Sequence, residues 1–155
     1  MHRRALLATA TAASTASLAG CSVPPWGDDP ESIDGAEVTL RREHTGEFRS
    51  AEPGPQDAAE LHRALDADPP RITVRGRLLD GSRECYRVAL VEAELADAAL
   101  RLRLTTEDDP DYEESGCSDI GQDHPYEVDV EFDEAPIAER VEVRHGDETV
   151  LDERV

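Results

Sequence analysis

The sequence contains no lysine and few aromatic residues. All 16 of its basic residues are arginine, against 36 aspartates and glutamates, so the formal net charge is −20. Without lysine, the chain cannot use Schiff-base or lysine-nucleophile chemistry. It also has no basic stripe to displace counterions from phosphates, which argues against nucleic acid as a partner. The negative charge disfavours adhesion of the folded part to an anionic membrane surface.

Several catalytic and ligand-binding motifs are missing as well. The five histidines are scattered, and there is no His-Glu-x-x-His, Cys-x-x-Cys or Gly-x-Ser-x-Gly motif and no glycine-rich phosphate loop. We therefore expect no metal, no cofactor and no enzymatic activity. A small extracytoplasmic hydrolase remains an alternative, because the carboxylates are too numerous for any catalytic pair to be singled out or dismissed.

The first 20 residues have the features of a signal peptide. They contain no acidic residue, and the basic pair Arg3-Arg4 precedes a run of small or apolar residues over 5–18. That run is too short to span a bilayer, which requires about 20 predominantly apolar residues. The arginine pair followed by Ala5, Leu6 and Leu7 resembles the twin-arginine export signal, which implies export of a folded chain.

A second motif ends this segment. Leu18-Ala19-Gly20-Cys21 resembles the lipobox of prokaryotic lipoproteins. The resemblance implies cleavage directly before Cys21, lipid on its sulfur, and anchoring to the outer face of the cytoplasmic membrane. Two alternatives are an ordinary secretory signal with a chance cysteine and an uncleaved N-terminal anchor.

Residues 21–34 form the next segment. They combine Pro24, Pro25 and Pro30 with several acidic residues and show no periodic apolar pattern. Such a composition favours an extended, solvated and disordered tether. At this chain length, one domain over residues 35–155 is the natural expectation.

Within residues 35–155, apolar and polar residues mostly alternate. This two-residue period is typical of half-buried antiparallel strands. It covers five segments: 38–41, 72–78, 100–105, 126–132 and 141–144. Residues 86–95 carry apolar side chains in both phases, which predicts a central strand. Turn residues at 80–81, 97 and 145–147 separate the strands.

One segment departs from this period. Ala58, Leu61 and Leu65 have helical spacing within residues 56–66, with Pro55 before them and Pro69-Pro70 after them, which predicts a short helix. We therefore expect a mainly β protein, an antiparallel β-sandwich of six or seven strands with one short helix over an edge or end of the sheets. Its strand number resembles that of immunoglobulin-like domains.

Cys85 and Cys117 remain once Cys21 is assigned to the lipid. A pair of cysteines in an exported domain predicts a disulfide. Closing 32 residues of sequence separation would stabilise the fold by roughly 3.5–4 kcal/mol in the chain-entropy model. The alternative is a thiol enzyme with Cys117 as nucleophile and His124 as base.

Residues 107–114 form the densest acidic run, with six carboxylates in eight positions. Calcium requires several oxygens on a turning loop, so Asp109, Asp111 and Glu113 are candidate ligands. The run does not match an EF-hand loop, because Glu114 stands where that motif has glycine. A calcium-binding module is thus an alternative function, and a solvated loop is the simpler interpretation.

The acidity itself indicates an environment. From Cys21 onward, 14 arginines and 36 acidic residues leave a net charge of −22. This acidic, lysine-free composition resembles that of proteins from salt-loving archaea, in which twin-arginine lipoproteins are common. The combined resemblance implies a domain that folds at molar salt. We expect a monomeric, lipid-anchored, non-enzymatic binding or envelope-structural module, with the membrane reached through Cys21 and an unknown protein or small molecule as partner.

Overall fold

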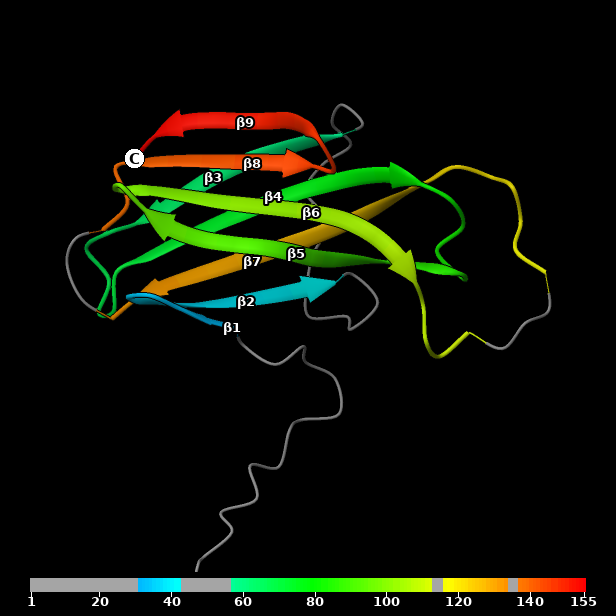
Figure 1. Ribbon diagram of the computed structural model, residues 1–155, viewed down its shortest axis with the longest axis horizontal. Helices are drawn as coiled ribbons and strands as arrows, with labels where there is room; N and C mark the ends of the chain where they lie inside the picture. Colours follow the sequence, from blue (N-terminus) through cyan, green and yellow to red (C-terminus); the bar gives the residue numbers. More distant parts are fainter. Residues whose placement is uncertain (1–30, 43–56, 113–115, 134–136) are drawn as a thin grey trace, which may run out of the picture.

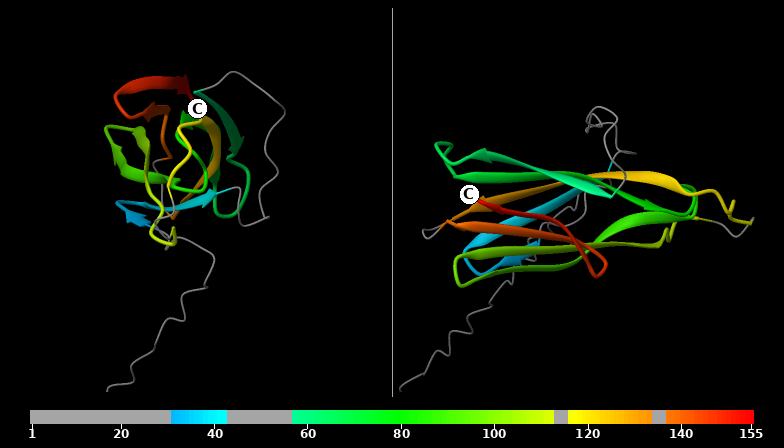
Figure 2. Two further views of the ribbon diagram at one scale, coloured as in Figure 1. Left: turned by 90° about the vertical axis from the view of Figure 1, so that its right-hand side faces the viewer. Right: turned by 90° about the horizontal axis from the view of Figure 1, so that it is seen from above.

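The computed structural model describes residues 31–42, 57–112, 116–133 and 137–155, and this part is built entirely of strands, turns and loops. Two sheets pack face to face (Figures 1 and 2), which confirms the prediction of a mainly β, sandwich-like protein. The described residues form nine strands, more than the six or seven expected. The strands are β1 (Glu31–Ile33), β2 (Ala36–Arg42), β3 (Ala58–Ala64), β4 (Arg71–Asp80), β5 (Tyr86–Ala96), β6 (Ala99–Asp108), β7 (Gln122–Phe132), β8 (Arg140–His145) and β9 (Glu148–Arg154).

The strands divide into sheets of five and four. The first sheet has the order β1-β2-β7-β4-β3, and the second has the order β5-β6-β8-β9. Every neighbouring pair is antiparallel except β6 and β8, which are parallel. The chain reaches β8 from β6 by way of β7 in the opposite sheet, so β8 returns in the direction of β6. The expectation of a purely antiparallel sandwich is therefore wrong at this one pair. β1 lies in the last part of the segment predicted to be a tether.

The core lies between the two sheets. It is made of one alternating set of residues from each strand, as the two-residue period predicts. Its largest fully buried side chains are Tyr126, Phe132, Ile72, Leu100, Leu102, Leu104, Val38, Val74, Val128, Val130, Val141 and Val143.

β5 is an edge strand, so its predicted central position is wrong. The register between β5 and β6 shifts between Leu90 and Glu92, which leaves Val91 as an extra residue, 48% exposed. A β-bulge of this kind moves the inward-facing set by one residue. Val88 and Leu90 pack on the core before the bulge, and Ala93 and Leu95 do so after it. Apolar residues in both phases therefore mainly reflect the bulge, and Ala89, buried beside Val88, is the one residue of the other phase that is also covered.

The helix predicted over residues 56–66 is also wrong, because β3 occupies this segment. β3 pairs with β4 along its whole length, and Leu61 lies opposite Val74. Ala59 and Leu61, two residues apart, are the side chains that pack against the core. Backbone pairing to the open edge of β4 outweighs the helical preference of alanine, leucine and glutamate, since propensity is a weak prior against tertiary context.

The outer face of β7 carries buried acids. Glu127 and Asp129 are each 6% exposed, although they alternate with the core residues. Glu127 accepts hydrogen bonds from Arg41 at 2.9 Å and Arg75 at 2.6 Å. Asp129 accepts one from Thr73 at 2.6 Å and pairs with Arg41 at 2.6 Å. The central strand of the first sheet is thus β7, covered by apolar packing on one face and by arginines from β2 and β4 on the other.

A buried polar cluster ties the two sheets together. The Tyr126 hydroxyl of β7 lies 2.7 Å from His145 Nε2 at the end of β8, and His145 Nδ1 lies 3.6 Å from Asp57 Oδ1. Tyr126 crosses over Gly76 of β4, where an added Cβ would lie 2.3 Å from the tyrosine oxygen. Gly76 is therefore required for the tyrosine to reach the opposite sheet.

Candidate functional site

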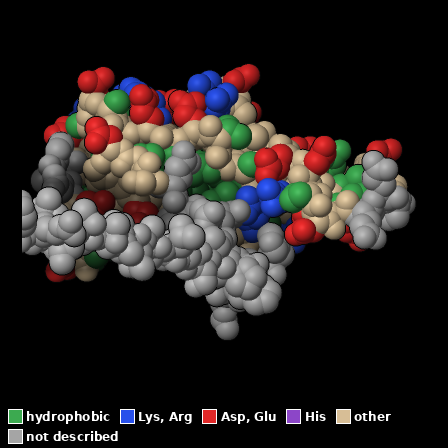
Figure 3. All heavy atoms as spheres, turned by 60° about the horizontal axis from the view of Figure 1, so that its bottom comes forward, with side chains coloured by type: hydrophobic (Ala, Val, Ile, Leu, Met, Phe, Trp, Pro, Cys, Tyr) green, Lys and Arg blue, Asp and Glu red, His purple; other side chains and the backbone are tan. Residues whose placement is uncertain are grey.

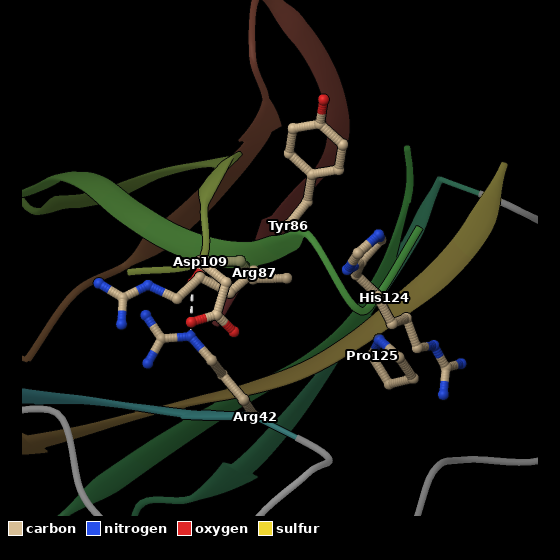
Figure 4. Close-up of a pocket in the computed structure, with 8 residues that line it drawn as sticks. Arg42, Tyr86, Arg87, Asp109, His124 and Pro125 are labelled. Atoms are coloured by element: carbon tan, nitrogen blue, oxygen red, sulfur yellow. Dashed lines mark hydrogen bonds between the residues drawn. The ribbon is translucent and has the colours of Figure 1, made fainter. Parts of the chain in front are cut away.

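A pocket of about 330 Å³ (Figure 4) is lined by residues at the ends of β2 and β6 and at the starts of β5 and β7. This volume is at the lower end of the range for small-molecule sites. Side chains from both sheets converge on it. The lining residues are Arg42, Arg83, Tyr86, Arg87, Val88, Asp109, His124 and Pro125.

Arg42 connects the two sheets at this pocket. It is the last residue of β2 and follows Val38 and Leu40 in the inward-facing phase. Its Nε donates a 2.6 Å hydrogen bond to the carbonyl of Val88 at the edge of the second sheet. Burial lowers the pKa of Arg42 to about 10, helped by the charge of Arg87 and opposed by nearby carboxylates. The guanidinium remains charged at neutral pH and lies next to a second cation.

The second cation, Arg87, comes from β5. Its Nε donates to Glu107 Oε1 at 2.8 Å, and its Nη2 lies 2.7 Å from the same oxygen. In Figure 4 the guanidinium groups of Arg42 and Arg87 lie next to each other, with the Asp109 carboxylate beside them. The Asp109 amide donates to the Cys85 carbonyl at 2.7 Å, which holds this carboxylate at the pocket.

The other wall of the pocket is formed by the chain around β7. His124 is buried, and its Nε2 lies 2.8 Å from the carbonyl oxygen of Gly81, to which it donates. Arg83 Nε donates to the Asp123 carbonyl. Pro125 and Val88 supply apolar surface, and the ring of Tyr86 points away from the two arginines in Figure 4.

The pocket gathers arginine side chains in an otherwise acidic protein. Three arginines line the pocket, against the carboxylates of Asp109 and of Glu107. Figure 3 shows arginine side chains gathered on one face of the molecule with acidic side chains around them. Planar guanidinium forks of this kind match the oxygens of carboxylates and phosphates.

The predicted disulfide between Cys85 and Cys117 is present and borders this pocket. It joins the residue before β5 to the loop between β6 and β7, with 5.9 Å between the two Cα atoms. Cys117 therefore has no free thiol, and His124 binds a backbone carbonyl. The alternative of a Cys117 nucleophile with a His124 base is wrong in this structure.

Of the three candidate calcium ligands, Asp109 and Asp111 lie in the described residues. Asp109 faces Arg42, and its Oδ1 accepts a 3.0 Å hydrogen bond from the amide of Asp111. Asp111 is exposed, and Glu113 lies outside the described residues. Within the described ranges, no group of three or more His, Cys, Asp or Glu side chains is arranged to hold a metal ion. A cation at Asp109 would have to compete with the arginine already there.

The predicted export and lipidation residues lie outside the described part of the chain. They are Arg3, Arg4, Leu18, Ala19, Gly20 and Cys21. In the segments that the structure does describe, no helix has the length and apolar character needed to cross a membrane.

Sequence reasoning missed the arginines of the pocket. Arg42 carries a usable signal, because it occupies the inward phase of a strand whose preceding inward residues are Val38 and Leu40. Arg87 carries no such signal. It alternates with core residues like any surface arginine, and its place at the pocket depends on which strand of the other sheet ends nearby.

No protein-family model, no curated protein and no solved structure matches the chain.

Proposed function

We propose that the protein is a non-enzymatic binding module, held at the outer face of the cytoplasmic membrane by lipid on Cys21, which contacts its ligand at the arginine-lined pocket. The single observation that carries the binding role is the convergence of Arg42 and Arg87 from opposite sheets in a concave site of ligand-sized volume. In a chain of net charge −20, two neighbouring arginines in one pocket differ from the mostly acidic surface around them.

Two features support the location. Leu18-Ala19-Gly20-Cys21 fits the lipobox pattern at each position. The Cys85–Cys117 disulfide is of the kind that persists in oxidising compartments outside the cytoplasm.

From the resemblance to immunoglobulin-like sandwiches we take only the position of the binding surface. In those domains, loops clustered at one end of the two sheets carry the contacts. Here the pocket also lies at one end, between the end of β2 and the starts of β5 and β7. The parallel β6–β8 pair differs from the immunoglobulin strand arrangement.

The anchor is tested by fractionation of the full chain, expressed in a prokaryotic host that lipidates lipobox proteins. The wild type is expected in the membrane fraction and in the detergent phase of a detergent partition. Cys21→Ser is expected to move the protein out of both, and Ser22→Ala, the matched control, is expected to leave it there. Membrane association of Cys21→Ser equal to that of the wild type would contradict lipid anchoring.

The binding role is tested by nuclear magnetic resonance with a mixture of neutral, cationic and anionic small fragments. Fragments that bind are expected to shift the amide signals of Val88 and Asp109 and to leave that of Val155, at the opposite end of the sandwich, unchanged. A fragment set that perturbs no pocket residue would overturn the proposal, whatever the result of the fractionation.

A further inference from the structure

We propose that Asp57, His145 and Tyr126 form a proton-operated switch, in which a proton taken up by His145 draws the Asp57 carboxylate from the end of β4 to the end of β8. This inference is independent of what the arginine-lined pocket binds. Three observations carry it: a buried ring nitrogen without a partner, a carboxylate oxygen that faces two donors, and the exposure of that carboxylate to solvent.

The His145 ring is satisfied on one side only. It lies at the end of β8, and its side chain is 5% exposed. Nε2 lies 2.7 Å from the Tyr126 hydroxyl, whereas the buried Nδ1 has no hydrogen-bond partner among the described residues. The Asp57 carboxylate is just beyond hydrogen-bond distance, with its Oδ1 3.6 Å from Nδ1. Because an unsatisfied buried nitrogen is costly, a small approach of this carboxylate would be favourable.

The same oxygen of Asp57 already serves another donor. Asp57 Oδ1 accepts a 2.9 Å hydrogen bond from the amide of Leu79, near the end of β4. The backbone of Asp57 lies in the left-handed region, with a φ of 52°, which is a costly conformation for a residue with a Cβ. The contact with His145 therefore competes with the bond to Leu79 for an acceptor in a strained position.

Protonation of the ring changes the outcome of this competition. With the proton of the neutral ring on Nδ1, the Tyr126 hydroxyl donates to Nε2. The cationic ring donates through Nε2 to the tyrosine oxygen and through Nδ1 toward Asp57. A charge-assisted hydrogen bond is shorter and stronger than a neutral one, so Oδ1 is drawn to Nδ1 and away from the Leu79 amide. The bond to the fully buried Tyr126 holds the ring, and Asp57 is the partner that moves.

The surroundings of the ring set the pH range of the switch. The Asp57 side chain is 41% exposed, so its contact with His145 joins a buried ring to solvent. Among the described residues, the charged and titratable groups that act on the ring are Tyr126 from β7, Asp57 ahead of β3 and Glu148 opposite it on β9. Its neighbour on β6 is the apolar Leu104. Burial lowers the pKa of His145 and the two carboxylates oppose this, so the ring is neutral at pH 7 and takes up its proton in acid.

The test is a pH titration by nuclear magnetic resonance on the detergent-solubilised full chain, at a fixed salt concentration at which circular dichroism shows it folded. The ring signals of His145 report its protonation, and hydrogen exchange at the Leu79 amide reports the bond to Asp57. As the ring takes up its proton, Leu79 exchange, corrected for the intrinsic effect of pH, is expected to become about tenfold faster with the same midpoint. The Val74 amide, in the middle of β4 between β3 and β7, is expected to keep its protection.

Three variants complete the design. Asp57→Asn keeps an oxygen for the Leu79 amide but has no charge, so Leu79 protection is expected to stay constant through the titration. His145 in this variant is expected to take up its proton at a lower pH, because an attracting charge is lost. His145→Gln should remove the Leu79 transition, and His62→Gln, at an exposed position on β3, is the matched control that should keep it. Should His145→Gln fail to fold, which circular dichroism would show, Asp57→Asn still decides the question.

Three results would overturn the inference. They are a His145 ring that titrates while Leu79 keeps its protection, a Leu79 transition that is unchanged in Asp57→Asn, and loss of protection at Val74 together with Leu79. The last result would show that acid unfolds the whole domain and that no local switch exists. The proposed binding function stands or falls separately, because it is measured with fragments at the pocket.

Discussion

At the scale of the residue, Gly76 and Tyr126 illustrate how one missing side chain allows a long-range contact. Gly76→Ala would place a Cβ 2.3 Å from the tyrosine oxygen, so the ring must move away from His145. We expect a loss of about 2–4 kcal/mol of unfolding free energy, as for other overpacked cores. Gly121→Ala is the matched control, because its added Cβ meets no neighbour closer than 3.7 Å. Denaturant unfolding with both variants measures this, and equal midpoints would contradict the steric argument.

The buried ring of His145 leads to a prediction about the stability of the fold at acidic pH. Burial lowers its pKa from the ordinary 6.5, and the charges of Asp57 and Glu148 oppose the shift only in part. The unfolded chain then binds a proton at a higher pH than the folded chain does, so stability falls as pH drops below about 6.5 toward the folded-state pKa. With the proton of the neutral ring on Nδ1, the Tyr126 hydroxyl donates to Nε2, and protonation of Nε2 reverses the bond so that the ring donates to the tyrosine oxygen.

The measurement is the free energy of unfolding between pH 8 and about 5.5. We expect the wild type to lose stability over this interval, by less than about 1.4 kcal/mol per pH unit for a single proton. His145→Gln should flatten the profile, and His62→Gln, a control at an exposed position on β3, should keep it. A wild-type slope in His145→Gln would assign the pH dependence to another group.

At the scale of the element, the strands show what periodicity can and cannot predict. The alternation over 126–132 and 141–144 predicts β7 and β8 because one face of each is apolar. The same pattern suggests that Glu127 faces water, whereas it is buried under arginines of neighbouring strands. A charged residue in the outer phase has the same sequence signature in either case. The partner strands decide its burial, and they are distant in sequence.

The candidate site was predictable in part for the same reason. The disulfide follows from two cysteines in a chain that is predicted to be exported, and it indicates that residue 117 lies near the start of β5. The pocket depends in addition on Arg42 of one sheet meeting Arg87 of the other. Predicting that contact requires the strand order of both sheets and the offset between them. The helix wrongly predicted over 56–66 and the central position wrongly predicted for β5 lead to a different strand order, so the contact could not be predicted.

The buried ion pairs on β7 give a prediction at this scale. Arg75→Gln removes one of the two donors to Glu127, which is 6% exposed, and we expect a cost of about 1–3 kcal/mol in unfolding free energy. Arg101→Gln breaks an exposed pair with Glu94 and should cost less than about 1 kcal/mol. The double variant Arg75→Gln with Glu127→Gln should recover part of the loss, because no charge is then left undercompensated. Equal losses for Arg75→Gln and Arg101→Gln in thermal unfolding would show that burial adds nothing to this pair.

At the scale of the whole molecule, added salt has two opposite effects on the stability of the fold. It screens the repulsion between carboxylates, and it weakens their ion pairs with arginine. Residues 21–155 carry 36 acidic residues against 14 arginines, so most carboxylates repel one another without a cation of their own. Salt screens this repulsion, since the Debye length falls to about 3 Å at 1 M. Salt also weakens exposed pairs such as Arg63 with Glu153, but it affects the buried pairs at Glu127 much less. Because carboxylates outnumber arginines, we expect the screening of repulsion to outweigh the weakening of ion pairs.

We therefore expect the protein to fold as the salt concentration is raised. Circular dichroism should show little strand signal at about 0.1 M NaCl and a cooperative, folded protein at about 3 M NaCl, because screening removes most of the self-repulsion of the compact state. The double variant Asp66→Asn with Glu84→Gln removes two exposed negative charges and should lower the salt concentration at which folding is half complete. A variant that replaces buried Asp129 with asparagine should instead raise it, since it takes away one of the two carboxylate partners of Arg41. Equal folding of the wild type at both salt concentrations would show that the arginine pairs alone offset the charge, and the halophilic interpretation of the composition would then be wrong.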